Sequence, residues 1–185
     1  IIIDADLRLP AVARILNISA KKGLVSYMEG KSTLDESIVK EYFPNLDVLP
    51  SEKRAPNPTQ VLNSEAFVSM LQDLRTKYDK IFIDTPPIGA VSDAISLLPY
   101  VDGIIYVIKH NAIKRKVIKS YIRKLLESNV PILGAVMNMV STSAQAYSTS
   151  YYNKAYTNYY VDTPPEEFEE AEETDSTETE EKNDK

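Results

Sequence analysis

The sequence predicts an α/β domain built on a doubly wound, mostly parallel sheet. Three short runs, at residues 81–83, 103–108 and 132–140, are apolar at nearly every position. Such runs are typical of parallel strands that helices cover on both faces. Between the second and third runs, residues 114–127 repeat apolar side chains at helical spacing. This alternation of strands and helices favours the doubly wound arrangement.

The first half of the chain supplies further elements of the same kinds. A β-branched strand at residues 1–3 is followed by a loop at 4–10 and a short helix at 11–16. Residues 23–37 predict a loop that contains a short helix, and residues 46–49 predict another strand.

A further helix is expected from Asn57 onward. Asn57 is a suitable N-cap, and Pro58 suits the first helical position. An apolar stripe at helical spacing follows it, formed by Val61, Leu62, Phe67, Met70, Leu71 and Leu74. These features predict one continuous amphipathic helix.

Composition excludes several kinds of site. The 185 residues contain no cysteine, which rules out a disulfide scaffold, a thiolate zinc site and a cysteine nucleophile. His110 is the single histidine, which argues against a multi-histidine metal centre or a Ser-His-Asp triad. No apolar run approaches the roughly 20 residues that cross a bilayer. The chain starts without methionine, inside a strand, so we expect a fragment of a longer protein.

Charge is divided unevenly along the chain. Residues 162–185 contain 12 Asp or Glu and two Lys, a net charge of −10, whereas residues 1–161 carry a net charge of +4. No core pattern returns after Ser141, and the composition of residues 141–185 is typical of disorder. The acidity of the whole chain therefore belongs to its tail.

Acidic residues follow two of the predicted strands. Asp84 directly follows the apolar run 81–83, as in a Walker B element, where a rigid strand holds the carboxylate that binds Mg²⁺ beside a phosphate. The alternative is that Asp84 only caps the next turn. Asp4 and Asp6 end the first strand, and two carboxylates this close share a site only if a cation or a proton separates their charges. The alternative for this pair is a solvated loop.

The motif Asp-Ala-Asp-Leu-Arg-Leu-Pro at residues 4–10 resembles the Walker A-prime motif of bacterial tyrosine kinases of the capsule and exopolysaccharide type. Asp-Thr-Pro-Pro at 84–87 is similar to their Walker B motif, which MinD/ParA-like ATPases share. The strings at 55–64 and 132–138 also resemble the family, and the likeness covers about residues 1–160. It implies a P-loop NTPase fold of MinD/ParA-like type.

Six of the 12 tyrosines lie within fourteen positions: Tyr147, Tyr151, Tyr152, Tyr156, Tyr159 and Tyr160. Polar residues separate them, so they do not form a core pattern. Such a tract can self-associate, stack on single-stranded nucleic acid, or accept phosphate. Lys154 is its only base, which argues against nucleic acid. The cluster matches the phosphoacceptor tail that ends the bacterial tyrosine kinases.

The resemblance implies a role for each candidate residue. Asp4 and Asp6 would bind Mg²⁺ and activate the tyrosine hydroxyl, and Asp84 would coordinate Mg²⁺. Asn138 would contact the adenine of ATP, and Arg8 a phosphate or a neighbouring subunit. The six clustered tyrosines would receive the γ-phosphoryl group, a transfer that depends mainly on positioning and charge neutralisation.

The P-loop string G-x-x-x-x-G-K-[ST] does not occur in the chain. In the family it precedes the Walker A-prime strand, which is where this chain begins. We therefore expect residues 1–140 to be a partial nucleotide-binding kinase domain, followed by a flexible tyrosine-cluster tail at 141–161 and an acidic disordered tail at 162–185. We also expect this polypeptide alone to be inactive.

The resemblance implies a tyrosine autokinase that regulates capsular or exopolysaccharide synthesis and export. Its implied partners are a membrane adaptor similar to a chain-length regulator, a cognate tyrosine phosphatase, and further copies of itself through tail-to-active-site contacts. It would be cytoplasmic and reach the membrane through the adaptor. The alternatives are a MinD/ParA-like switch ATPase that positions or partitions cargo, and a catalytically inactive interaction domain.

A cluster of cations lies on or near the predicted helix at 114–127, and it consists of Lys109, Lys114, Arg115, Lys116, Lys119, Arg123 and Lys124. The simplest interpretation is a solvated face. The alternatives are contact with anionic lipid headgroups or with phosphotyrosines of a neighbouring subunit.

Overall fold

The structure is a computed structural model, and it describes residues 1–140. The expected tails at 141–161 and 162–185 lie outside the described residues, as do the six clustered tyrosines. The observations below therefore concern residues 1–140.

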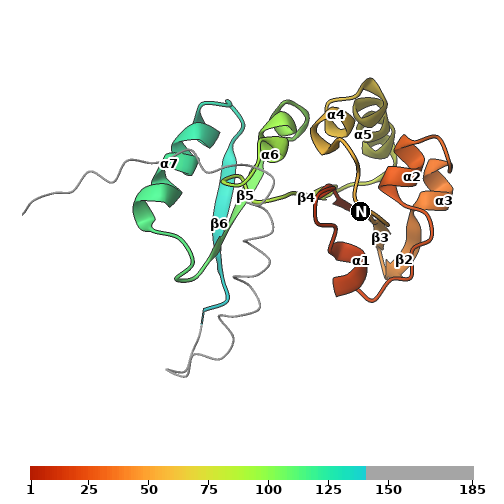
Figure 1. Ribbon diagram of the computed structural model, residues 1–185, viewed down its shortest axis with the longest axis horizontal. Helices are drawn as coiled ribbons and strands as arrows, with labels where there is room; N and C mark the ends of the chain where they lie inside the picture. The colour runs from red at the N-terminus through yellow and green to blue at the C-terminus, as the bar shows by residue number, and fades with distance from the viewer. Residues whose placement is uncertain (141–185) are drawn as a thin grey trace, which may run out of the picture. The chain divides into compact units, whose positions relative to one another are not determined.

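The first sheet has four strands in the order β2-β3-β1-β4 (Figure 1). They are β1 (Ile2–Asp4), β2 (Val39–Phe43), β3 (Leu46–Leu49) and β4 (Phe82–Asp84). β1 is parallel to both β3 and β4, whereas β2 forms an antiparallel hairpin with β3. Asp4 is opposite Asp84 in the register of β1 and β4. The carboxyl ends of these two strands therefore meet at one edge of the sheet.

The helices around this sheet are short, apart from α5. They are α1 (Val12–Ile15), α2 (Leu24–Met28), α3 (Leu34–Ser37), α4 (Pro58–Leu62), α5 (Glu65–Lys77), α6 (Asp93–Ser96) and the 3₁₀ turn η1 (Leu98–Tyr100). Their apolar faces and the strands enclose a single buried cluster, whose fully enclosed members include Ile3, Leu7, Leu24, Leu49, Leu62, Phe67 and Leu74. This core holds the carboxyl ends of β1 and β4 in place.

The helix expected from Asn57 through Leu74 is two helices, so the prediction of one continuous helix was wrong. The Ser64 hydroxyl accepts a hydrogen bond from the Phe67 amide and starts α5 as its N-cap, which interrupts the helical path after α4. Pro58 is the first residue of α4 as expected, but the Asn57 side chain makes no capping hydrogen bond. The apolar stripe is preserved because both helices pack on the same core.

The second sheet consists of the parallel strands β5 (Ile104–Lys109) and β6 (Ile132–Asn138), which α7 (Arg115–Leu126) connects. These three elements were predicted, and the mostly parallel α/β class is confirmed. The sequence suggested strands covered on both faces, and here it was wrong, since Ile105 is 51% exposed and Leu133 is 69% exposed. Within residues 1–140 no strand joins the free edge of β4 to that of β5. The parallel strands therefore form two sheets.

No helix in the part of the chain that the structure describes is both long enough and apolar enough to cross a lipid bilayer.

Candidate functional site

Asp4 is the last residue of β1 and is completely buried. Its Oδ2 atom accepts hydrogen bonds from the amides of Ala11 at 3.1 Å and Val12 at 3.0 Å, and so holds the start of α1. Its Oδ1 atom is buried and has no hydrogen-bond partner among the described residues. A buried, unsatisfied carboxylate oxygen is costly, so this atom is suited to a proton or a cation.

Asp6 organises the loop between β1 and α1. Its Oδ1 atom accepts hydrogen bonds from the backbone amides of Arg8 at 3.2 Å and Leu9 at 2.9 Å. This is the local pattern by which aspartate stabilises turns. Because only 7% of Asp6 is exposed, the turn holds its carboxylate just beneath the surface.

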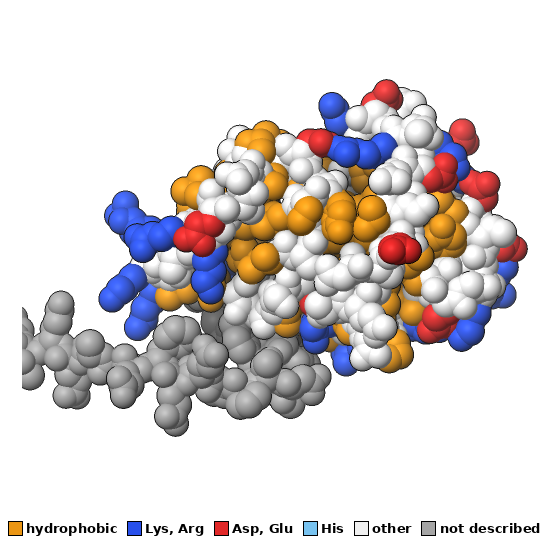
Figure 2. Space-filling view, turned by 90° about the horizontal axis from the view of Figure 1, so that it is seen from above, with side chains coloured by type: hydrophobic (Ala, Val, Ile, Leu, Met, Phe, Trp, Pro, Cys, Tyr) orange, Lys and Arg blue, Asp and Glu red, His pale blue; other side chains and the backbone are white. Residues whose placement is uncertain are grey.

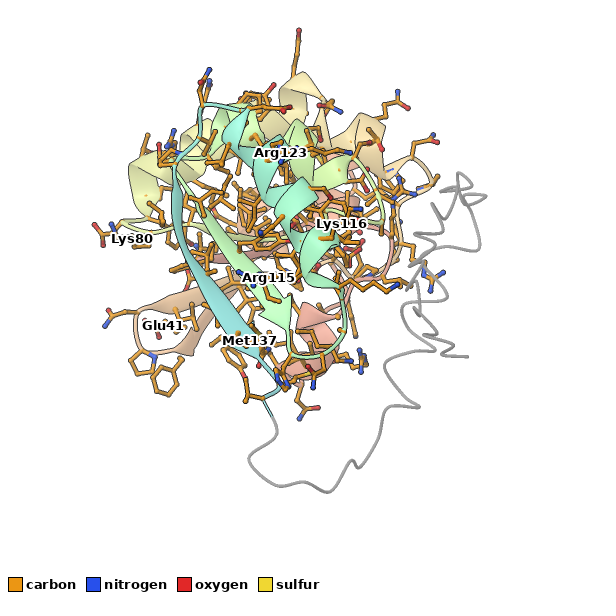
Figure 3. The ribbon with its side chains drawn as sticks, turned by 90° about the vertical axis from the view of Figure 1, so that its left-hand side faces the viewer. Glu41, Lys80, Arg115, Lys116, Arg123 and Met137 are labelled. Atoms are coloured by element: carbon orange, nitrogen blue, oxygen red, sulfur yellow. The ribbon has the colours of Figure 1, made fainter. Side chains whose placement is uncertain are left out.

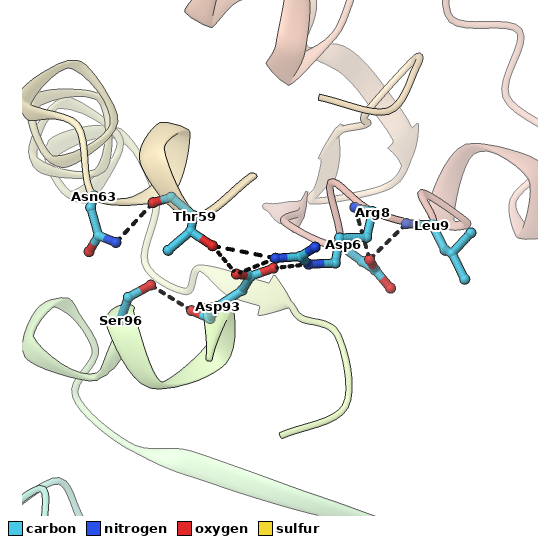
Figure 4. Close-up of polar contacts among 7 residues, drawn as sticks. All are labelled: Asp6, Arg8, Leu9, Thr59, Asn63, Asp93 and Ser96. Atoms are coloured by element: carbon cyan, nitrogen blue, oxygen red, sulfur yellow. Dashed lines mark hydrogen bonds and ion pairs between the residues drawn. The ribbon is translucent and has the colours of Figure 1, made fainter. Parts of the chain in front are cut away.

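Arg8 is fixed by two residues that are distant in the sequence (Figure 4). Its Nε donates to Oδ2 of Asp93 at 2.7 Å, and its Nη2 lies 3.3 Å from Oδ1 of the same carboxylate. The Thr59 hydroxyl donates to Asp93 Oδ1 at 2.6 Å. Asp93 is completely buried, whereas the Arg8 side chain is 32% exposed, so this bidentate ion pair is shielded from solvent on the Asp93 side. We call Arg8, Thr59 and Asp93 the latch.

Asp84 ends β4 and lies opposite Asp4. Its backbone carbonyl accepts a 2.8 Å hydrogen bond from the Ala5 amide, which ties the two strand ends together. Unlike Asp4 and Asp6, Asp84 has an exposed side chain. Nearby protein still displaces enough water to raise the pKa of its carboxyl, while a hydrogen bond from the Thr85 amide opposes the rise.

The carboxyl groups of Asp4 and Asp6 both bind protons more tightly than ordinary aspartates. Burial raises the pKa of Asp4 to about 7, and repulsion from Asp84 and Asp6 adds to the rise. The hydrogen bond from the Val12 amide acts in the opposite direction and lowers this pKa. Burial likewise raises the pKa of Asp6, with Asp84 and Asp93 contributing repulsion. Like charges gathered in this way favour a bound proton or cation.

This edge of the sheet does not form a complete metal site by itself. Within residues 1–140, no group of three or more His, Asp or Glu side chains is placed to hold a metal ion. Mg²⁺ usually binds through one or two carboxylates and completes its shell with phosphate oxygens and water. The oxygen-only chemistry of Asp6 and Asp84, and the unsatisfied oxygen of Asp4, fit that mode of binding.

The structure does not bring every candidate residue to this place. Asn138 ends β6, which belongs to the other sheet, and its side-chain oxygen accepts a hydrogen bond from the amide of Met139. The six clustered tyrosines lie outside the described residues. Asp4, Asp6, Arg8 and Asp84 are therefore the candidates that residues 1–140 gather at one edge.

Sequence reasoning missed several residues that shape the site. Thr59 and Asp93 complete the latch, and the Ser51 hydroxyl donates a 2.8 Å hydrogen bond to the Asp4 carbonyl. Ser51 also lines a hollow of about 480 Å³ beside the loop, together with Pro10, Ala13, Arg14, Ile18, Ser19, Ala20, Glu52, Lys53 and Arg54. The one available signal was that Ser51 follows the strand at 46–49, at the same edge as Asp4.

The comparisons with known proteins found relatives but no matching family model. The chain is 35% identical over 148 residues to tyrosine-protein kinase CpsD of Streptococcus agalactiae, covering 80% of this chain and 64% of CpsD. It is 30% identical to the putative tyrosine-protein kinase CapB of Staphylococcus aureus, covering 83% of this chain and 68% of CapB. The chain thus spans about two thirds of the length of these relatives.

Solved structures agree with this result. The VpsO kinase domain matches with a TM-score of 0.71 and 37% identity, over 76% of this chain and 70% of that one. The kinase domain of the Escherichia coli tyrosine kinase ETK matches with a TM-score of 0.70 and 30% identity, and the match covers 81% of this chain and 59% of that one. The cell division ATPase MinD of Pyrococcus furiosus matches with a TM-score of 0.61, over 83% of this chain and 64% of that one. At 20% identity this match shows the fold alone. The resemblance seen in the sequence is confirmed, and the chain belongs to the family of bacterial tyrosine-protein kinases.

Proposed function

We propose that the protein is a tyrosine autokinase that transfers the γ-phosphoryl group of ATP to its own clustered tyrosines, Tyr147 to Tyr160. The observation that carries this proposal is the meeting of Asp4, Asp6 and Asp84 at one sheet edge, with Asp4 and Asp84 in register. Membership in the kinase family supports it. The activity belongs to the whole protein, of which residues 1–140 would contribute part of the nucleotide-binding domain.

The carboxylates would have separate tasks. Asp84 and Asp6, which lie nearest to solvent, would hold Mg²⁺, whose charge neutralises the phosphates during transfer. A tyrosine hydroxyl has a pKa near 10, so it must lose its proton as its oxygen attacks the γ-phosphorus and the bond to the ADP oxygen breaks. Asp4 would take that proton, because its pKa of about 7 leaves part of it ionised at neutral pH and gives it a higher proton affinity than an ordinary carboxylate.

The remaining candidates have weaker support. Arg8 is already bound to Asp93, so we propose that it holds the loop around Asp6 and does not bind phosphate. The role of Asn138 at the adenine is proposed from family resemblance alone.

The wider role is regulation of capsular or exopolysaccharide synthesis and export, with association at the membrane through an adaptor. A solved structure described as the chimerical protein CapA2B2, 31% identical with a TM-score of 0.70, supports partnership with a second polypeptide. Self-association through tail-to-active-site contacts and resetting by a tyrosine phosphatase complete the proposal.

The experiment is phosphotyrosine mapping on the full-length protein after incubation with Mg-ATP. We expect phosphate on the tyrosines between 147 and 160, and at least a roughly hundredfold loss of rate in Asp84→Asn, because a metal contributes several kcal/mol to such a transfer. Asp79→Asn is the matched control, since Asp79 is exposed and lies outside the site. ATP hydrolysis with unmodified tyrosines would favour the switch ATPase. Absence of both phosphate transfer and ATP hydrolysis, in the wild type as in Asp84→Asn, would favour an inactive interaction domain.

A further inference from the structure

The segment that contains β5, α7 and β6 carries a concentrated positive charge. Residues 103–140 hold seven Lys or Arg and one acid, Glu127, whereas residues 1–102 hold 11 Lys or Arg and 14 Asp or Glu. Figure 2 shows blue side chains gathered over α7. The positive charge of the described residues is therefore a local property of this segment.

The charge lies mainly on one face of α7. Arg115, Lys119 and Arg123 are spaced four residues apart, so they share a face of the helix. Lys116 follows Arg115, and Figure 3 labels Arg115, Lys116 and Arg123 on α7. Leu126 comes three residues after Arg123 on the same face and is 63% exposed. The four cations are also exposed. We call these five residues the α7 face.

Helix stability does not explain this arrangement. Like charges four residues apart repel each other, as in the pairs Arg115–Lys119 and Lys119–Arg123. The first turn has no acidic residue, so its cations also oppose the helix dipole. None of the ion pairs within residues 1–140 uses a cation of α7. The cations therefore destabilise the isolated helix, and contact with an external anionic partner would offset their repulsion.

We propose that the α7 face binds the anionic surface of a lipid bilayer. A row of exposed cations matches a plane of lipid phosphates, and each cation near such a surface adds to the attraction. Leu126 distinguishes a membrane from a partner that offers only phosphate, because an exposed leucine among cations gains by entering the interface between headgroups and acyl chains. The opposite side of α7 is occupied within the protein, where Leu125 is buried. This inference is independent of nucleotide binding and goes beyond the proposed kinase activity.

The test is co-sedimentation of the full-length protein with vesicles of phosphatidylcholine alone or with about 30% phosphatidylglycerol. We expect binding only to the anionic vesicles, and a strong loss of binding at about 0.5 M salt, where screening is nearly complete. The variant Lys116→Gln/Lys119→Gln/Arg123→Gln should bind on the order of a hundredfold more weakly. Leu126→Ser should weaken binding severalfold at unchanged charge.

The matched control is Lys21→Gln/Lys31→Gln/Lys80→Gln, which removes three charges from residues 1–102 and should bind anionic vesicles like the wild type. Circular dichroism checks that each variant is folded. Equal binding by the α7 variant and the control would overturn the proposal, as would equal binding to neutral vesicles. Full competition by soluble glycerophosphoglycerol at the same phosphate concentration, with no effect of Leu126→Ser, would also overturn it, because it would indicate a phosphate site and not a membrane surface.

Discussion

Residues 1–102 and residues 103–140 differ in how completely they bury their apolar side chains. Every member of the main buried cluster lies between Ile1 and Leu97. In the second region Leu125 is the buried apolar residue within the described chain, while Val107, Leu133 and Met137 are all more than half exposed. A parallel pair of strands is normally covered on both faces. The comparison shows that the carboxylate site is built on the well-packed region.

The largest expected effect is on the core of the first region. Phe67 is fully buried, so Phe67→Ala should lower the free energy of unfolding by about 3–5 kcal/mol. Leu133→Ala, at a side chain that is 69% exposed, should change it by less than about 0.5 kcal/mol. Urea denaturation of the two variants measures the contrast. Equal losses would mean that β6 is covered in solution, and would contradict the difference in burial between residues 1–102 and residues 103–140.

The second effect concerns pH and belongs to the first region alone. The folded pKa of Asp4 is raised to about 7 from an ordinary value of 3.8, so the folded state binds more protons than the unfolded state between these values. Stability should therefore fall as pH rises from about 4 to 7, by on the order of 2–4 kcal/mol for this group. Asp4→Asn should remove the share of the dependence that Asp4 contributes, while Asp6 and Asp84, whose pKa values are also raised, keep theirs. The test is to measure the free energy of unfolding of both proteins at pH 5 and pH 8. If the difference between the two pH values is as large in Asp4→Asn as in the wild type, the raised pKa of Asp4 is contradicted.

The latch should matter more than an exposed ion pair. Asp93→Ala leaves Arg8 without its buried partner and should cost about 2–3 kcal/mol in the free energy of unfolding, since Arg8 itself is partly solvated. Asp73→Ala, which breaks the exposed pair with Lys77, should cost less than about 0.5 kcal/mol. Thermal unfolding of both variants gives the comparison. Similar small losses would show that the latch is not closed in solution.

The smallest effects come from two glycines. A Cβ atom at Gly23 would collide with the carbonyl oxygen of Pro50, so Gly23→Ala should lower the free energy of unfolding by about 1–3 kcal/mol. A Cβ atom at Gly134 in β6 would meet no atom within 4 Å, so Gly134→Ala should change stability by less than about 0.5 kcal/mol. Chemical denaturation separates the two, and a large loss at Gly134 would indicate packing against β6.

Local patterns predicted most of the strands and longer helices and the strand-end carboxylates, because these depend on neighbours in the sequence, whereas β2, α6 and η1 were not predicted. The apolar run before Asp84 was sufficient to place that residue at a sheet edge. The hairpin of β2 and β3 was missed, although Pro44 and Asn45 form its two-residue turn and Asn45 has a positive φ of 63°. The latch could not be predicted, since Asp93 has no local feature that points to Arg8. The division into two sheets likewise depends on long-range pairing.

The latch also bears on the order in which the domain folds. Its contacts join residues separated by 85 positions between Arg8 and Asp93 and by 34 between Thr59 and Asp93. Pairings across such long stretches of chain form slowly, because closing the intervening loop costs entropy before any contact repays it. The turn around Asp6 can form early from its own backbone amides, but its final position waits for Asp93. A chain with an unfinished fold would thus lack a rigid acidic edge, so that assembly of the domain precedes the chemistry proposed for it.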